Sequence, residues 1–290
     1  MRVAAELKGP PVEIVSIDSM QVYRGMDIGT AKASAADRAA VPHHLVDLVE
    51  PHEEFGVTAM AAAAEEALAD IRARGRRALL VGGTGLYVQA IVDELRPPGR
   101  WPEVRADLEG QADTAALHDR LTELDPAAAA KMTPTNRRRV IRALEVTVGS
   151  GRPFSSFGSG LQAYPDRPGF RMAGVWMPRA ELRRRIADRF HDMVEAGLVA
   201  EVEALAARDA GSAGLSRTAR QALGYRELLA HVEEGRPLDE CVAEAIRRSQ
   251  AFARRQRMWF RRDPRIRWFG TARNPLAVVP ALLGEWNECG

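Results

Sequence analysis

The chain opens with an alternation of apolar runs and polar, glycine-containing stretches. An apolar run over 12–17 contains β-branched residues and has the length of a buried strand. The polar stretch 18–32 has neither a helical nor a strand period, which is typical of an active-site loop at the carboxyl end of a strand; an ordinary surface turn is the alternative. A second apolar run over 78–81 leads into a glycine-rich turn and a helix. Repeated strand–loop–helix units predict a parallel α/β sheet.

The remaining pattern is mostly helical, with apolar residues at three- and four-residue spacing. The predicted helices are 35–38, 57–75, 102–108, 114–124, 135–148, 180–208 with a break at Gly197, 218–234 and 238–262. Two further strands are predicted over 170–177 and 265–269.

These elements predict an α/β fold with a parallel-sheet, P-loop NTPase-like core. An all-helical insertion is expected between the last two strands, where P-loop kinases carry a lid. The predicted boundaries are 1–178 for the α/β core, 179–243 for the helical insertion, and 244–290 for a basic helix with the last core strand.

Composition indicates a soluble globular protein of 290 residues, with 46% apolar and 28% charged residues. No apolar run approaches the ~20 residues that span a membrane, and the N-terminus lacks the apolar region of a signal peptide. Cys241 and Cys289 form neither a metal-binding spacing nor a disulfide framework. We therefore expect a cytoplasmic protein without a membrane partner.

Charge is distributed unevenly along the chain. Residues 133–262 carry 24 arginines and no lysine against 15 acidic residues, whereas the rest carries 17 basic and 24 acidic residues. A general preference for Arg explains why only 3 of 41 basic residues are Lys, but not this asymmetry. The asymmetry predicts a polyanionic partner for the second half of the chain.

The basic helix 238–262 has two rows of arginines at seven-residue spacing beside an aromatic row. Phosphate contacts with base stacking would use such rows, whereas core aromatics with solvated arginines are the alternative. The rows are Arg247, Arg254 and Arg261; Arg248, Arg255 and Arg262; and Phe252 with Trp259.

The turn after the second strand has the sequence GGTG. Its glycines would let backbone N–H groups approach an anion at a helix N-terminus. Alone, GGTG is a weak motif. Because it directly follows a second buried strand, it predicts a phosphate site beside Asp18, at the end of the first strand.

Six motifs occur in the same order in the tRNA dimethylallyltransferases, also called tRNA isopentenyltransferases. They are DSMQVYRGMDIGTAK, PHHLVD, LLVGGTGLY, RRVIRALEV, ALGYREL and RRQRMWFRRD, and the resemblance covers 13–269. It implies transfer of a dimethylallyl group from dimethylallyl diphosphate to N6 of the adenosine on the 3′ side of the tRNA anticodon, with release of diphosphate. A monomer that binds the anticodon stem-loop is expected.

The resemblance also implies roles for individual residues. Asp18 matches the carboxylate that accepts the proton of the adenine amine. Thr84 matches the residue at the leaving oxygen, and Arg105 a substrate-contacting arginine. Gly82, Gly83 and Thr84 form the diphosphate-side loop, where Mg²⁺ is expected although the sequence shows no ligand set. The tRNA contacts implied are Asp18, Ser19, Met20, Gln21, Arg138, Arg139, Val140, Ile141, Arg142, Gln221, Gly224, Tyr225, Arg226, Arg254, Arg255, Gln256, Arg257, Trp259 and Arg261.

The chain departs from the family at its start. The family opens with a strand and a phosphate-binding loop whose Lys grips the diphosphate. Here Lys8, Lys32 and Lys131 all lie outside any Gly-Lys-Ser/Thr sequence, and Met1–Leu7 matches the back half of the helix after that loop. We expect the natural protein to begin upstream of Met1. The alternatives are a catalytically impaired tRNA-binding fragment, an adenine-nucleotide prenyltransferase, and a small-molecule kinase on the same core.

Overall fold

The computed structural model describes residues 2–7, 9–95, 97–158, 161, 163–167, 169–209 and 214–287; Met1, Lys8 and Cys289 lie outside them. The described residues form two compact units. One lies within Met1–Glu94 and Asp166–Gly290, and the other within Leu95–Pro165. The boundaries predicted from the sequence, after 178 and after 243, both fall inside the first unit and do not coincide with this division.

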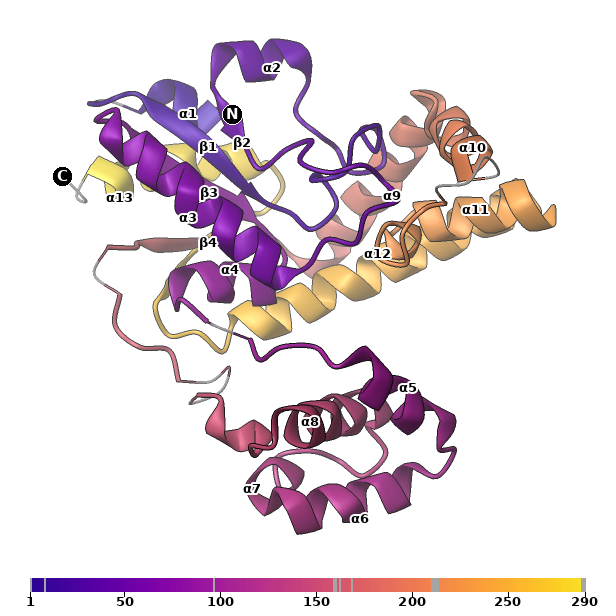
Figure 1. Cartoon of the computed structure of the whole chain (residues 1–290). Helices are drawn as coiled ribbons and strands as arrows, with labels where there is room; N and C mark the ends of the chain where they lie inside the picture. The colour runs from indigo at the N-terminus through magenta and orange to yellow at the C-terminus, as the bar shows by residue number, and fades with distance from the viewer. Residues whose placement is uncertain are drawn as a thin grey trace. The chain divides into compact units, whose positions relative to one another are not determined.

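The described strands of the first unit form two parallel sheets (Figure 1). Strand β1 (Val12–Ile17) lies between β2 (His43–His44) and β3 (Arg77–Gly82). Strand β4 (Met172–Trp176) pairs with β5 (Ile266–Gly270). All six residues of β1 are buried, which explains its nearly continuous apolar sequence. The predicted parallel α/β arrangement is confirmed.

The helices of the first unit follow the predicted pattern closely. They are α1 (Arg2–Glu6), α2 (Ala35–Ala40), α3 (Val57–Ala73), α4 (Gly85–Val92), α9 (Arg179–Glu195), α10 (Leu198–Asp209), α11 (Tyr225–Glu234), α12 (Leu238–Phe260) and α13 (Val279–Asn287). Helices α9 to α12 lie between β4 and β5 in the chain, and α12 packs against α4, α9 and α11 (Figure 1). Among the described residues, no helix combines the length and apolar character needed to cross a membrane.

Two helix boundaries depend on glycines with positive φ. Gly197, at φ +101°, separates α9 from α10, as predicted. The predicted helix 218–234 is wrong as a single element, because Gly224 has φ +88° and separates the short 3₁₀ helix Ala219–Gln221 from α11. A Cβ at Gly224 would also lie 3.0 Å from the Phe190 ring. Helix α13 was not predicted.

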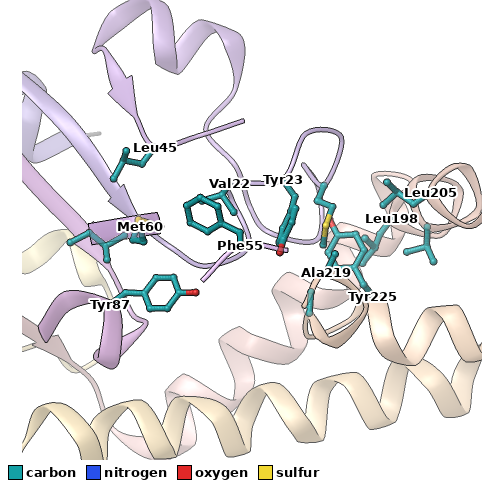
Figure 2. Close-up of a cluster of buried hydrophobic side chains, with 14 of the residues drawn as sticks. Val22, Tyr23, Leu45, Phe55, Met60, Tyr87, Leu198, Leu205, Ala219 and Tyr225 are labelled. Carbon is teal, nitrogen blue, oxygen red and sulfur yellow. The ribbon is translucent and has the colours of Figure 1, made fainter. Parts of the chain in front are cut away.

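One apolar cluster extends from the sheet to the helices that follow β4. It includes Ile17 of β1 and Met60 of α3 at the sheet, and Leu198 and Tyr225 of the helices. Figure 2 shows Met60 and Tyr87 at one side of this cluster and Leu198, Leu205 and Tyr225 at the other. The loop after β1 contributes Val22, Tyr23 and Met26 to this cluster, so the core itself helps to hold this loop.

A charged cluster surrounds Glu13, whose side chain is only 1% exposed on β1. Its carboxylate accepts hydrogen bonds from Arg74, from Arg76 (2.6 Å) and from His44 Nε2 (2.5 Å). The bonds from Arg74 outweigh the effect of burial and lower the pKa of Glu13 from 4.5 to about 2. The cluster therefore joins β1 to β2 and to the segment that enters β3.

Glu13→Gln is expected to lower the free energy of unfolding by about 2 kcal/mol near neutral pH, because a neutral amide replaces the buried carboxylate that accepts charge-assisted hydrogen bonds from Arg74 and Arg76. Since the pKa of Glu13 is lower in the folded state, its contribution is present above about pH 4.5 and disappears as the pH falls towards 2. Thermal unfolding of wild type and variant across this range measures the difference. Asp70→Asn, which removes an exposed partner of Arg74, is the control with a small effect. A difference that does not change with pH would contradict the assignment.

The second unit is helical. It comprises α5 (Pro102–Gly110), α6 (Thr114–Leu124), α7 (Pro126–Ala129), α8 (Arg137–Ser150) and the 3₁₀ helix Phe154–Ser156. Leu108, Leu121 and Leu144 pack in its own apolar core. Asp125 ties the unit together, because its carboxylate accepts from the N–H groups of Ala128 (3.0 Å) and Ser155 (2.7 Å). The predicted helices α5, α6 and α8 are confirmed, whereas α7 was not predicted.

Candidate active site

The candidate site lies where β1 and β3 end side by side. Ile17 is opposite Gly82 in the parallel register, so Asp18 and Gly83 follow at the same edge of the sheet. Asp18 is half-buried, and its Oδ1 accepts a hydrogen bond from the N–H of Met20 at 2.8 Å. The Thr84 hydroxyl donates to Ser19 Oγ at 3.4 Å. The structure thus brings together Asp18, Ser19 and Thr84, which are 66 positions apart at most along the chain.

The glycines after β3 permit three close approaches. A Cβ at Gly82 would lie 2.2 Å from the carbonyl oxygen of Ile17, and one at Gly85 would lie 2.4 Å from the Trp259 ring. A Cβ at Gly83 would lie 2.2 Å from Gln256 Nε2. Besides exposing backbone N–H groups, these glycines therefore let β1 and α12 pack directly against the turn.

Helix α12 contacts this turn with two residues that the sequence resemblance assigned to tRNA. Gln256 Nε2 donates to the carbonyl oxygen of Gly83 at 2.8 Å, and the Trp259 ring lies against Gly85. Their contact with tRNA stays a prediction, and the structure adds a supporting role. The other predicted residues of α12 and its end are exposed, namely Arg254, Arg255, Arg257 and Arg261.

One arginine of the predicted rows is already paired with a carboxylate of the protein. Arg248 donates to the buried carboxylate of Glu227 at 2.6 Å. The guanidinium of Arg255, from the same row, lies 5.8 Å from the Phe252 ring centroid. Arg257, which is outside both rows, lies 5.5 Å from the ring centroid of Trp176. Cation–aromatic contacts of this kind hold a guanidinium at the surface while leaving its N–H groups directed to solvent or ligand.

The loop 18–32 is closed by polar contacts of Lys32, whose side chain is buried. The Lys32 ammonium, with a side chain 2% exposed, donates to the Tyr23 carbonyl, to Asp27 Oδ1 and to Asp47 Oδ1 at 2.6–2.7 Å. Burial raises the pKa of Asp47, but the bonds from Lys32 and Arg38 outweigh it, so the pKa is lowered. Sequence reasoning missed this role, although a lysine inside a polar loop was its signal.

Gln21 spans the same loop. Its Oε1 accepts from the Ser16 hydroxyl at 2.8 Å, and its Nε2 donates to the Thr30 carbonyl at 3.1 Å. Met20 is partly buried and packs against the core. Both were predicted to contact tRNA, and that prediction is compatible with their partial exposure.

In the second unit, a buried carboxylate holds two of the predicted arginines. Glu145, 1% exposed, accepts from Arg142 at 2.9 Å, from Arg105 at 3.2 Å and from the N–H of Trp101 at 3.0 Å. Arg105 also pairs with Glu109 at 2.8 Å. Glu145 is a functional candidate that the sequence analysis missed.

The remaining predicted residues differ in exposure. Arg138, Arg139, Gln221 and Arg226 are exposed, as a direct contact with RNA requires. The side chains of Val140, Ile141 and Tyr225 are buried, and Gly224 is buried as well. These four positions support the surface from within, and contact through the side chains of Val140, Ile141 and Tyr225 would require the packing to open.

The oxygen donors at the site suit a hard cation. Mg²⁺ is commonly bound through one or two carboxylates together with substrate phosphates and water. Asp18 supplies one carboxylate here, and Ser19 and Thr84 supply hydroxyl oxygens at the same edge of the sheet. Within the described part of the chain, no group of three or more His, Cys, Asp or Glu residues is arranged to hold a metal by itself.

A parallel sheet with a polar loop and a glycine turn at the carboxyl ends of its strands defines the class of α/β proteins that bind ligands at this edge. The family model described as IPP transferase matches residues 21–263, and the chain belongs to this family. The P-loop NTPase-like fold and the resemblance inferred from the six motifs are confirmed.

Relatives and solved structures agree with this assignment. The tRNA dimethylallyltransferase of Kineococcus radiotolerans is 47% identical over 266 residues, covering 90% of this chain and 81% of the relative. That of Desulforudis audaxviator is 46% identical and covers 95% and 90%. A tRNA isopentenylpyrophosphate transferase structure from Bacillus halodurans has a TM-score of 0.68 at 36% identity, covering 99% and 91%. A structure of a eukaryotic dimethylallyltransferase acting on tRNA has a TM-score of 0.73 at 25% identity, covering 90% and 67%.

Proposed function

We propose that this chain transfers the dimethylallyl group of dimethylallyl diphosphate to N6 of the adenosine on the 3′ side of the tRNA anticodon. The observation that carries the proposal is the placement of Asp18 beside Thr84 at the ends of β1 and β3, in a chain whose relatives are named tRNA dimethylallyltransferases. The carboxylate can accept the proton that the adenine amine loses, and the hydroxyl lies on the side of the leaving diphosphate.

The chemistry of the transfer assigns the task of proton acceptor to Asp18. N6 of adenine forms a bond to the allylic carbon while the carbon–oxygen bond to diphosphate breaks, and the diphosphate leaves with the electron pair. The proton of N6 passes to the carboxylate of Asp18. Asp18 Oδ1 is already hydrogen-bonded to Met20, so we assign this task to Oδ2. The adenosine must leave the anticodon stack to reach this carboxylate.

Thr84 and the start of α4 face the developing charge of the diphosphate. Thr84 is the N-cap of α4, where backbone N–H groups and the helix dipole favour an anion. Mg²⁺, when bound, supplies further neutralisation of the leaving diphosphate. The hydroxyls of Ser19 and Thr84 would hold it together with diphosphate oxygens.

We further propose that the protein acts as a monomer in the cytoplasm.

A transfer assay tests the proposal. Purified protein is incubated with radiolabelled dimethylallyl diphosphate and Mg²⁺, together with tRNA, with AMP or without acceptor. The expected product is tRNA that yields N6-dimethylallyladenosine on digestion to nucleosides. Label in AMP but not in tRNA would favour a nucleotide prenyltransferase. Binding of tRNA without any transfer would favour a tRNA-binding module.

The exposed arginines of α12 and of its C-terminal end provide a second test. Replacing Arg254 and Arg261 together with Gln is expected to weaken tRNA binding about tenfold and to reduce the salt dependence of binding by roughly one unit of slope per arginine. Filter binding across a salt series measures both quantities. Arg72→Gln, on the exposed face of α3, is the matched control. An unchanged salt slope in the double variant would exclude α12 as the phosphate-binding surface.

A further inference from the structure

A single carboxylate links the active-site loop to the helices after β4. Glu201, in the first turn of α10, accepts hydrogen bonds from three consecutive backbone N–H groups of the loop. Its Oε2 accepts from Asp27 at 3.0 Å and from Ile28 at 2.8 Å, and its Oε1 accepts from Gly29 at 3.3 Å. Several N–H groups converging on one carboxylate form a charge-assisted arrangement stronger than neutral hydrogen bonds.

Tyr225, the first residue of α11, completes this contact. Its hydroxyl donates to Glu201 Oε1, and its ring is 2% exposed. Burial, followed by the bond to Glu201, raises the pKa of Tyr225, so the hydroxyl keeps its proton and donates. A Cβ at Gly29 would lie 2.5 Å from this ring and 2.9 Å from Leu198. The loop and the two helices are therefore fitted without space for a larger residue.

Hydrogen bonds joined by short backbone segments lead from this contact back to Asp18. The anchored segment 27–29 precedes Thr30, whose carbonyl accepts from Gln21 Nε2 at 3.1 Å. Gln21 also holds Ser16 of β1, and the neighbouring Met20 donates its N–H to Asp18. Fixing the far half of the loop thus restricts the half that carries the carboxylate.

We propose that Glu201 is a positioning residue, which ties α10 and α11 to the loop 18–32 and thereby fixes the orientation of Asp18. The inference rests on the proposed function in one respect, since Asp18 is taken as the proton acceptor of the transfer. It adds a link between the chemistry and α11, where Arg226 is exposed for contact with RNA. Nothing in the six sequence motifs identifies Glu201, because it lies outside all of them.

Kinetics of four variants test the proposal. Glu201→Gln, Glu201→Ala and Tyr225→Phe are compared with Glu203→Gln, which changes an exposed carboxylate on the same helix. For the Glu201 variants, kcat is expected to fall about ten- to a hundredfold, because small misplacement of a catalytic group is costly. The KM values for tRNA and diphosphate are expected to stay within about twofold, since the substrate contacts remain. Tyr225→Phe should give a smaller loss of kcat, and Glu203→Gln none.

Hydrogen exchange provides a measurement that does not depend on turnover. In the Glu201 variants, the amides of residues 27–29 are expected to exchange about tenfold faster, and the Met20 amide should also exchange faster. Faster exchange at 27–29 alone, with Met20 and kcat unchanged, would mean that Glu201 only stabilises the loop locally, and the inference would be overturned. Unchanged exchange at 27–29 would overturn it as well. If the wild-type protein transfers no dimethylallyl group, the proposed function fails, while the exchange at Met20 still decides whether Glu201 controls this part of the loop.

Discussion

Replacing Asp18 with Asn is expected to lower the rate of dimethylallyl transfer by about 10²- to 10⁴-fold while tRNA binding remains largely intact. The amide of Asn has nearly the shape of the carboxylate, and its oxygen can still accept the Met20 N–H that Asp18 holds at 2.8 Å. It cannot take up the proton that N6 must lose. The effect should therefore appear in kcat and not in the affinity for tRNA, as measured by single-turnover transfer and filter binding.

Two further variants define what this result means. Asp18→Ala should lose transfer to a similar or greater degree, because it also releases the Met20 N–H. Asp192→Asn changes an exposed carboxylate of α9 and should behave as wild type. Loss of tRNA binding by the Asp18 variants, with transfer to a minimal anticodon hairpin spared, would assign Asp18 to binding and exclude it as the proton acceptor.

Gly82→Ala is expected to abolish transfer and to lower the free energy of unfolding by about 2–3 kcal/mol. The added Cβ would lie 2.2 Å from the carbonyl oxygen and 2.7 Å from the carbonyl carbon of Ile17, which are backbone atoms of the neighbouring strand. A flexible side chain could move aside, but a backbone in a paired strand cannot do so without separating β1 from β3. Because Asp18 follows Ile17 and Thr84 follows Gly83, the separation would pull apart the two ends of the candidate site.

Gly284→Ala is the matched control for this substitution. Gly284 lies in α13, and a Cβ there would meet no heavy atom within 4 Å. Alanine should be neutral or stabilise this helix by up to about 1 kcal/mol. Thermal unfolding and transfer rate are measured for both variants. Wild-type stability and activity in Gly82→Ala would mean that the strands tolerate the extra atom, and the steric account of the GGTG turn would be wrong.

Strands and long helices were largely predictable because their local sequences are consistent with one period. The run Val12–Ile17 and the helix Thr114–Leu124 have the predicted bounds. The helix that begins at Tyr225 does not have its predicted start at residue 218. Its start depends on the positive φ of Gly224 and on the Phe190 ring beside that glycine. The second unit was not predicted as a separate unit, because its core forms between α5, α6 and α8. The sequence of each helix by itself does not indicate that these helices pack together.

The candidate site was predictable in part for a similar reason. Parallel strands place their carboxyl ends at one edge, so the sequence order alone indicated that Asp18 and Thr84 would meet. The contact between Gln256 and Gly83 joins residues 173 positions apart, and that between Glu201 and Ile28 joins residues 173 positions apart as well. Neither pair shares a local period or a motif, so sequence reasoning had no signal for them.

The sequence by itself determined the parallel α/β core, the family, and the loop 18–32 with the GGTG turn as the centre of the candidate site. These depend on local periodicity and on short motifs, which are properties of neighbouring residues. Only the tertiary structure decided which side chains are exposed to a substrate and which support the site from behind. Tyr225 and Lys32 belong to the second group because burial and hydrogen-bond partners are set by residues from distant elements that pack around them.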